Sequence, residues 1–222
     1  MRRKVISAAM SNPITFLKDT FPRLFHKGVE GLEAKVAEGN EKAGKILADV
    51  KGAAGHVVLV VEGEGEVYMK YADGKMQVID AKPTQDVKLA VAAPGPAVKM
   101  LLGEAEKEGE LEEGKAAKRA VRTVSKRVQD ALGAQSLLFH VNIENVPDHG
   151  TVTVKVGLNA PEPPQEPKFK ATIAFADLEA ARAGEVNAQM LFMGGKLRME
   201  GDYSAALQLG MQLMAQAQQD GF

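Results

Sequence analysis

The sequence predicts an α+β fold, in which β-hairpins build a sheet and helices that precede and follow the hairpins cover it. Three observations lead to this class. Short segments alternate apolar and polar residues between glycine-containing turns, which is typical of strands. Apolar residues with helical spacing occur before and after these segments. The 222 residues, 45% of them hydrophobic, suffice for a sizeable core in one large domain or two small ones.

The first part of the chain predicts helices followed by hairpins. Residues 14–50 have helical spacing, with Pro22 and Gly28 as the expected breaks. Further along, Asp73-Gly74 has the signature of a tight hairpin turn. After Pro94-Gly95-Pro96, a short helix is expected to end near Gly103. The expected strands of this part are residues 57–61, 67–71, 76–78 and 87–91.

The middle of the chain changes from acidic, at residues 104–113, to basic, at residues 115–127. The basic segment is expected to form one helix that docks through Val121, Val124 and Val128. One interpretation of its charged side is transient contact with an anionic membrane surface. The alternative, which is commoner for a run of charges, is a solvated face. The cations concerned are Lys115, Lys118, Arg119, Arg122 and Lys126.

Strand-like alternation then begins again, and the order of elements resembles the first part. The segment 87–91, with a helix ending at Leu102-Gly103-Glu104, corresponds to the segment 169–175, with a helix ending at Ala183-Gly184-Glu185. Such an internal repeat predicts two related units in tandem. The expected strands are residues 137–143, 152–158 and 169–175, the last after a loop with prolines at positions 161, 163, 164 and 167.

The C-terminal segment predicts a glycine turn, a short strand and a capped helix. Leu197 and Met199 share one face of the strand, because side chains alternate along it. Asp202 is suited to accept hydrogen bonds from the first N–H groups of a helix over residues 203–218. This helix has two neighbouring apolar stripes, one of which can dock on the sheet. The first stripe is Ala206, Leu209, Gly210, Leu213 and Ala217, and the second is Tyr203, Leu207, Met211 and Met214.

The same region contains a dense, ordered series of short motifs. They are Asp177-Leu178, Gly184-Glu185, Asn187 with Gln189, Phe192, Gly195-Lys196-Leu197, Met199 and Gly201-Asp202. In this order they resemble the sterol carrier protein 2 (SCP2) family. The resemblance covers about residues 169–213 and extends more loosely back to Leu137. Met199 stands where the family more often has Ile.

The resemblance implies a twisted, mainly antiparallel sheet with helices over one face. It also implies an apolar tunnel between the sheet and the C-terminal helix. On this basis, residues 14–133 are a truncated SCP2-like unit followed by the basic linker helix, and residues 134–222 are a more complete unit. A truncated unit has an open sheet edge, which either the basic helix or the second unit must cover. One fused body is therefore expected.

The functional hypothesis is non-catalytic binding and transfer of an apolar lipid, such as a fatty acid, a fatty acyl-CoA or a sterol. The alternative is an SCP2-like scaffold or dimerisation module, whose cavity is filled by its own side chains. Alternation and family position together indicate the residues on the sheltered side. The expected lining residues are Phe169, Ile173, Phe175, Leu178, Met190, Phe192, Met193, Leu197, Met199, Leu207, Met211 and Met214.

Composition argues against other classes of function. The chain has no cysteine, and its four histidines are widely separated and lack the spacing of metal ligands, so neither a metal site nor a cofactor is expected. No serine lies in a nucleophile motif. A formal net charge of −1 gives no general attraction to nucleic acid. The apolar segment after Arg2-Arg3-Lys4 is too short for a signal peptide, so a cytoplasmic protein is expected.

Overall fold

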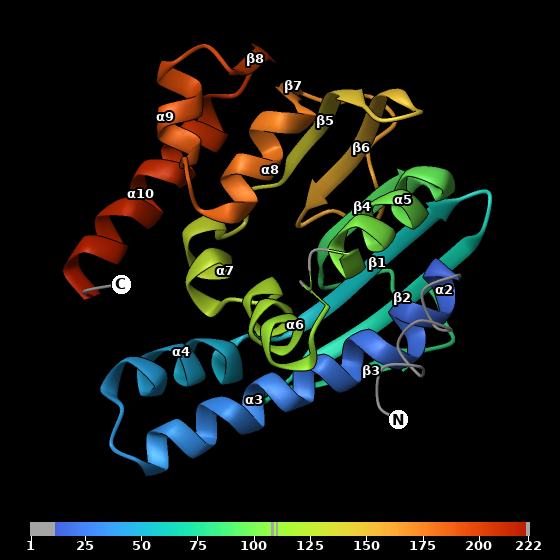
Figure 1. The fold of residues 1–222 in the computed structure, drawn as a ribbon. Helices are drawn as coiled ribbons and strands as arrows, with labels where there is room; N and C mark the ends of the chain where they lie inside the picture. Colours follow the sequence, from blue (N-terminus) through green and yellow to red (C-terminus); the bar gives the residue numbers. More distant parts are fainter. Residues whose placement is uncertain (1–11, 108, 110, 221–222) are drawn as a thin grey trace.

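The computed structural model describes residues 12–107, 109 and 111–220, and the side chains of the last helix as far as residue 213. Within these residues, eight strands form one twisted sheet in the order β3-β2-β1-β4-β6-β5-β7-β8 (Figure 1). The strands are β1 (Gly55–Glu62), β2 (Gly65–Ala72), β3 (Lys75–Ile79), β4 (Val87–Pro94), β5 (Leu137–Val146), β6 (Gly150–Leu158), β7 (Phe169–Ala174) and β8 (Leu197–Gly201).

Helices precede, separate and follow these strands. Several begin at a side-chain cap: Asn40 Oδ1 accepts from the Ala43 N–H at 2.9 Å, and Asn187 Oδ1 accepts from the Met190 N–H at 2.8 Å. The α-helices are α2 (Pro13–Thr15), α3 (Phe21–Ala37), α4 (Glu41–Gly52), α5 (Gly95–Lys107), α6 (Glu113–Ala120), α7 (Lys126–Leu132), α8 (Phe175–Ala183), α9 (Ala188–Met193) and α10 (Ser204–Asp220). A π-helical turn, η1 (Phe16–Thr20), joins α2 to α3, and a 3-10 turn, η2 (Val121–Thr123), follows α6.

The sheet is mixed and mainly antiparallel, which confirms the expected fold class. All neighbouring strands are antiparallel except two pairs, β1 with β4 and β5 with β7. The Asp73-Gly74 turn between β2 and β3 has positive φ at both residues, 52° and 72°. This is the backbone twist that a tight hairpin between right-twisted strands requires.

The chain repeats one arrangement of elements. In the first half, α3 and α4 precede the β1-β2 hairpin, β4 then pairs in parallel with β1, and α5 follows. In the second half, α6 and α7 precede the β5-β6 hairpin, β7 pairs in parallel with β5, and α8 follows. Each half also has one strand that the other lacks: β3 beside β2 in the first, and β8 beside β7 in the second. By this comparison α6 and α7 correspond to α3 and α4.

The two halves supply each other's missing strand. β4 and β6 pair antiparallel, from Leu89 opposite Leu158 to Ala92 opposite Lys155. In the first half, β6 lies beside β4 in the position that corresponds to β8 beside β7. In the second half, β4 lies beside β6 in the position that corresponds to β3 beside β2. Of the two alternatives for the open edge of the first half, the structure has the second half covering it.

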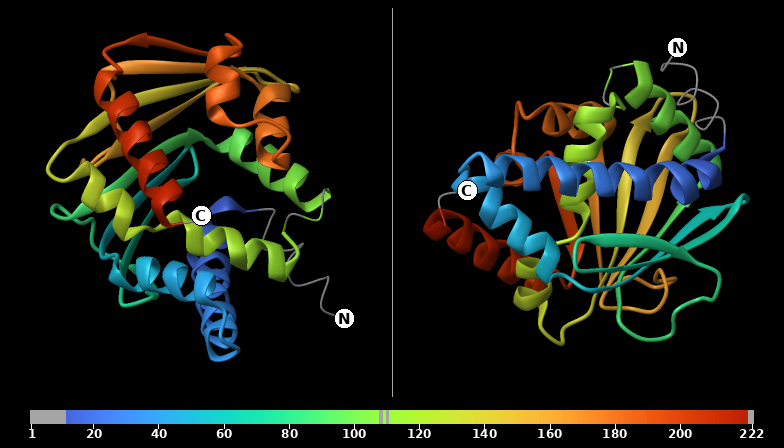
Figure 2. Two further views of the ribbon diagram at one scale, coloured as in Figure 1. Left: turned by 90° about the vertical axis from the view of Figure 1, so that its left-hand side faces the viewer. Right: turned by 90° about the horizontal axis from the view of Figure 1, so that it is seen from below.

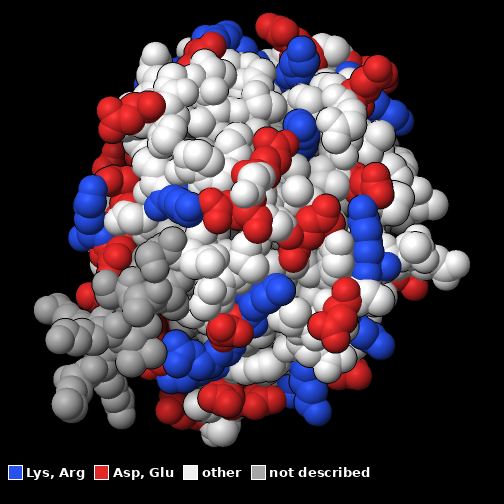
Figure 3. Space-filling model, turned by 90° about the vertical axis from the view of Figure 1, so that its right-hand side faces the viewer, with Lys and Arg blue, Asp and Glu red and all other residues white. Residues whose placement is uncertain are grey.

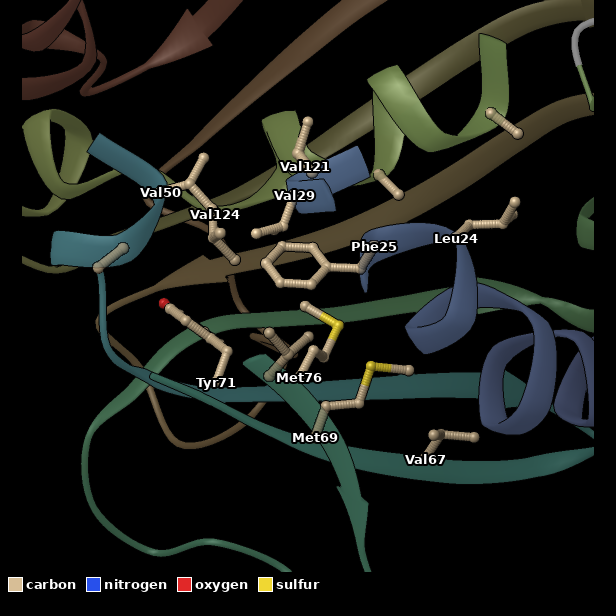
Figure 4. Packing of buried hydrophobic residues seen from close by; sticks show 14 of the residues in the cluster. Leu24, Phe25, Val29, Val50, Val67, Met69, Tyr71, Met76, Val121 and Val124 are labelled. Atoms are coloured by element: carbon tan, nitrogen blue, oxygen red, sulfur yellow. The ribbon is translucent and has the colours of Figure 1, made fainter. Parts of the chain in front are cut away.

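The larger core cluster lies between the first half of the sheet and the helices α3, α4 and α6. Phe25 on α3 is fully buried and points into its centre, near Met76 and Val124 (Figure 4). Gly28 allows α3 and α6 to approach closely, since a Cβ there would lie 2.4 Å from the backbone oxygen of Ala117. The prediction that Gly28 breaks the helix is therefore wrong: α3 continues through it, because a residue without a side chain is needed at this crossing.

The basic segment is not one helix, and that prediction is also wrong. Ser125 ends the irregular turn after η2 and caps α7, its Oγ accepting from the Val128 N–H at 3.3 Å. Thr123 Oγ1 donates to the Ala120 carbonyl at 2.6 Å, which helps to close α6. Val121 and Val124, in the segment between α6 and α7, are nevertheless buried, and Val128 on α7 is partly buried, so the expected docking face is present.

The opposite face of the sheet is covered by the proline-containing loop before β7. His140 on β5 is buried, and its Nε2 donates to the Pro164 carbonyl at 2.9 Å. Lys155 Nζ donates to Glu62 Oε1 at 2.9 Å and to Gln165 Oε1 at 3.4 Å. The small cluster on this face contains Val58, Val87 and Ala90, with Val60 and Tyr68 beside it.

The crossing of α3 and α6 gives a matched test of packing. Gly28→Ala is expected to destabilise the protein by about 1–3 kcal/mol, because the new methyl group would overlap both the Ala117 backbone oxygen and the Val121 side chain. Gly31→Ala, one turn later on α3, is expected to stabilise by up to about 1 kcal/mol, because a Cβ there meets no atom within 4 Å. Urea unfolding of both variants measures the difference. Equal effects would contradict the close approach.

The shared sheet leads to a second expectation. Separately expressed residues 1–133 and 134–222 should be insoluble or molten, because the cut leaves one edge of β4 and one edge of β6 unpaired and separates α7 from α10. The whole chain should unfold in one cooperative step by circular dichroism and by calorimetry. Two independent, well-folded fragments would refute the fused body.

Candidate functional site

A continuous row of apolar side chains crosses five strands on the helix-covered face of the sheet. Leu59 is opposite Val91, Val91 is opposite Val156, and Val156 is opposite Phe139. Phe139 is in turn opposite Phe169, and their rings stack with centroids 4.9 Å apart and planes 9° apart. We call these five residues the central apolar row. With neighbouring strands about 4.8 Å apart, the row is about 19 Å long.

The middle of this row is not packed as a core. Although they lie in the centre of an eight-stranded sheet, Leu59, Val91, Val156 and Phe139 all remain partly exposed. Among the residues whose side chains are described, Val91, Val156 and Phe139 belong to neither core cluster and are not packed against one. Central strands with covered faces normally bury such side chains. Accessible apolar surface therefore remains here, between two packed regions.

Most helices on this face pack against the two ends of the sheet, and α5 also contacts the central strands β1 and β4. α3, α4 and α6 pack with the first half through the larger cluster, while α5, α8 and α9 contribute to a second cluster with Ile143, Val152 and Ile173. α10 runs from β8 toward α7, which it contacts (Figure 2). On α10, Ala206, Leu209 and Leu213 are partly buried. Its first stripe is thus the more sheltered one.

The motif residues of the C-terminal segment hold this part of the fold together. Lys196 Nζ donates to Asp177 Oδ1 at 2.7 Å, which ties the start of β8 to α8. Gly195 and Gly201 have φ of 68° and 92°, and a Cβ at Gly201 would lie 2.5 Å from the Lys168 oxygen. Asp202 Oδ1 accepts from the Ser204 N–H at 3.3 Å, at the start of α10. These residues have structural roles in positioning β8 and the two helices that flank it.

The expected lining residues lie in three kinds of environment. Phe169 and Ile173 are buried; Phe175, Leu178, Leu197 and Met199 are partly buried; and Met190, Phe192, Met193, Leu207 and Met211 are exposed, by 41% to 78%. The side chain of Met214 lies outside the described residues. The structure brings Ile173, Phe175, Leu178 and Leu197 together in the second cluster and places Met199 opposite Ala171.

Sequence reasoning missed most of the central apolar row. It included Phe169 but not Phe139, Val156, Val91 or Leu59. The alternation of these residues was visible in the sequence. The register that joins β4 to β6, and so aligns them across both halves, has no local signal, because strand pairing between distant segments is set by the whole fold.

A charged pocket of about 520 Å³ lies between α6 and α8. Arg119 contributes from α6, and Arg182 and Glu179 from α8, where Arg182 Nη1 donates to Glu179 Oε1 at 2.5 Å. Three alanines, Ala176, Ala180 and Ala183, form the rest of the α8 side, with Glu185 beyond its end. The pocket therefore suits a polar or charged group better than an aliphatic chain.

Among the described residues, the titratable group with a large pKa shift is Tyr71, which lies in the larger cluster and not on the row. Burial raises the pKa of Tyr71 to about 12, opposed in part by the hydrogen bond from Gln129 Nε2 to its hydroxyl at 2.6 Å. This pair ties β2 to α7 within the larger cluster, and His26 Nε2 there accepts from the Met76 N–H at 3.0 Å. No group of three acidic or histidine side chains that could hold a metal occurs among the described residues.

One face of the molecule is mixed in charge. On the face shown in Figure 3, basic and acidic side chains are interspersed, without a large area of one sign. None of the helices in the described ranges is both long enough and apolar enough to span a membrane. The exposed large apolar side chains concentrate instead on α9 and α10.

The fold and the row define an α+β protein with accessible apolar surface in the middle of its sheet. Residues 106–214 match the model of the SCP-2 sterol transfer family. The match is just under half of the chain and includes α6 and α7, which the sequence-based division assigned to the first unit.

Two solved structures are among those similar to this chain. The apo form of sterol carrier protein 2 from Yarrowia lipolytica is 20% identical, with a TM-score of 0.29, over 37% of this chain and 75% of that protein. Sterol carrier protein domain 2 of Helicoverpa armigera is 18% identical, with a TM-score of 0.30, over 52% of this chain and 87% of that domain. A comparison with curated proteins gives no match.

Proposed function

We propose that this protein binds an apolar lipid on the central apolar row and transfers it without chemical change. The observation that supports the proposal most directly is the partial exposure of Val91, Val156 and Phe139 in the middle of a covered sheet. The match of residues 106–214 to the sterol transfer family is consistent with this proposal. A fatty acid, a fatty acyl-CoA or a sterol would bind through the burial of its hydrocarbon.

The energetics of such a site favour an extended hydrocarbon. Burial contributes about 0.8 kcal/mol for each CH₂ group. A ligand that lies across the strands can contact side chains from both halves along the row. The charged pocket between α6 and α8 is the proposed position for a polar headgroup, because its lining has charges of both signs, Arg119 and Arg182 together with Glu179 and Glu185.

We assign α10 the role of a movable cover. The helix follows β8 directly, and between Ser204 and Gln219 it has no charged residue. Its first stripe faces the protein, while Leu207 and Met211 of the second stripe are exposed by 41% and 65%. A rotation or displacement of α10 toward the sheet would bring the second stripe against a bound lipid.

Delivery requires contact with a membrane, and the basic surface of α6 is the proposed contact. Lys115, Lys118, Arg119 and Arg122 are all exposed on α6 and η2. Lys126 is separated from them by the break before α7, where it pairs with Asp130. Anionic lipid would attract such a cluster by about 1 kcal/mol per basic residue near the surface.

The scaffold or dimerisation alternative has one observation in its favour, the exposed side chains of Met190, Phe192 and Met193 on α9. Contiguous apolar surface of this kind often marks a partner site. Native mass spectrometry combined with lipid extraction separates the two functions. Retained lipid supports transfer, and a lipid-free dimer supports the alternative.

A substitution within the row gives a steric test. Val156→Phe is expected to weaken binding of a fluorescent long-chain fatty acid roughly tenfold, because the larger ring displaces about two CH₂ groups of ligand. Val60→Phe is the matched control, because Val60 is a partly buried strand residue on the opposite face. Thermal unfolding checks that both variants are folded. Equal affinity of the two variants would place the ligand elsewhere.

The cover role of α10 leads to a test by hydrogen exchange. Amides of residues 203–220 should exchange faster in lipid-free than in lipid-loaded protein, because none of the described side chains of α10 is fully buried and such a helix opens at low free energy unless a ligand holds it. Deletion of residues 203–222 should abolish lipid retention and also lower stability. Exchange that is identical with and without lipid would show that α10 is ordinary core.

A further inference from the structure

A second pocket, of about 700 Å³, lies on the outer side of the helices, between α3, α4 and α6. Leu32, Ile46, Ala117 and Val121 form an apolar wall. Val121 is a buried member of the larger core cluster, and Leu32 and Ile46 are partly buried against it, whereas Phe25 and Val29 on α3 lie deeper in that cluster. The α3 and α6 layer therefore separates this pocket, which we call the α3–α6 pocket, from the central apolar row.

Glycines give the α3–α6 pocket its depth. Gly31 on α3 and Gly114 on α6 both line it, and a Cβ at either position would meet no atom within 4 Å. At Gly28 the opposite holds, since Val121 Cγ1 lies 2.4 Å from the position of a Cβ. The helices thus touch at Gly28 and leave open space beside Gly31. A larger side chain at Gly31 would project into that space.

Positive charge surrounds this apolar wall. Four cations line the pocket, Lys27, Lys35, Lys118 and Arg122, against two acids, Glu30 and Glu113. Lys27 pairs with Glu113. Lys35, Lys118 and Arg122 form no ion pair with any described residue, and all three are exposed. The pocket therefore offers an apolar wall together with basic groups that have no acidic partner.

We infer that the α3–α6 pocket binds a monomeric amphiphilic anion, that is, an acidic headgroup with an aliphatic chain of medium length. The chain would pack on Leu32, Ile46 and Val121, while the headgroup would lie within reach of Lys35, Lys118 and Arg122. A volume of this size is typical of small-ligand sites. An inorganic anion would leave the apolar wall uncovered, and an uncharged chain would leave the cations without a partner. The inference is independent of lipid binding on the central apolar row.

A carboxylate of a free fatty acid and a phosphate of a membrane lipid share this chemistry. The assignment here is to the free, monomeric amphiphile. The direct experiment titrates the full-length protein with decanoate, below the concentration at which it forms micelles, by calorimetry. Amide signals of Gly31 and Gly114 in two-dimensional nuclear magnetic resonance spectra report the place of binding.

Three variants separate volume from charge. Gly31→Leu fills the space and is expected to abolish binding of decanoate to this pocket. The matched control is Gly103→Leu on α5, where a Cβ also meets no atom within 4 Å. This control variant should bind decanoate normally. The double variant Lys118→Gln, Arg122→Gln should weaken decanoate binding roughly fivefold at low salt and less at high salt. It should leave the binding of uncharged decanol unchanged.

Defined outcomes would overturn the inference. In the first, Gly31→Leu leaves decanoate binding unchanged and Val156→Phe removes it, which would place decanoate on the sheet. Another is binding only to phosphatidylglycerol vesicles and not to decanoate, which would make the cations a membrane contact. The Gly31→Leu variant is expected to retain long-chain fatty acid on the central apolar row. A failure of the inference about the α3–α6 pocket can therefore be distinguished from a failure of the proposed function.

Discussion

Backbone pairing between β4 and β6 holds the two halves of this protein in one sheet. A strand edge exposes a row of N–H and C=O groups that must find partners, and here each half satisfies the edge of the other. The pairing runs only from Leu89 opposite Leu158 to Ala92 opposite Lys155. This short junction has a large structural effect, because it decides that the helices of both halves share one face of a single sheet.

The candidate lipid site is a consequence of that junction. Two core clusters lie on the helix-covered face, one around Phe25 and one around Ile143, and α5 contributes side chains to both. The junction brings Val91 and Val156 side by side, and neither residue belongs to one of these clusters or packs against it. Helices in such a sheet cover the face in segments, and the boundary between segments is where apolar surface remains accessible. The site is therefore a property of how the halves meet rather than of either half alone.

Local features of the fold were predictable from the sequence, and long-range ones were not. Alternation indicated the strands, and Asp73-Gly74 and Asp202 marked a turn and a helix start that the structure contains. Gly28 was misread because a glycine that breaks a helix and a glycine that lets two helices touch have the same local signature. The break at Ser125 was missed because a serine within a helix and a serine that caps one have the same local signature. Of the site, Phe169 was found, but its partners across β5, β6, β4 and β1 depend on a register with no local signal. The exposure of Met190, Phe192 and Met193 was not predictable either, because the spacing of apolar residues indicates the apolar face of an element but not which other element covers that face.

The exposed methionines of α9 and α10 have a chemical consequence. Met193, Met211 and Met190 are exposed by 78%, 65% and 56%, whereas Met69 and Met76 in the larger cluster are exposed by 0% and 2%. A dissolved oxidant reaches the first three thioethers and is excluded from the other two. Conversion of a thioether to a sulfoxide replaces a flexible apolar group by a polar one, and methionine sulfoxide reductases reverse it. The apolar character of this end of the molecule thus depends on the redox state of its surroundings, while the core around Phe25 does not share that sensitivity.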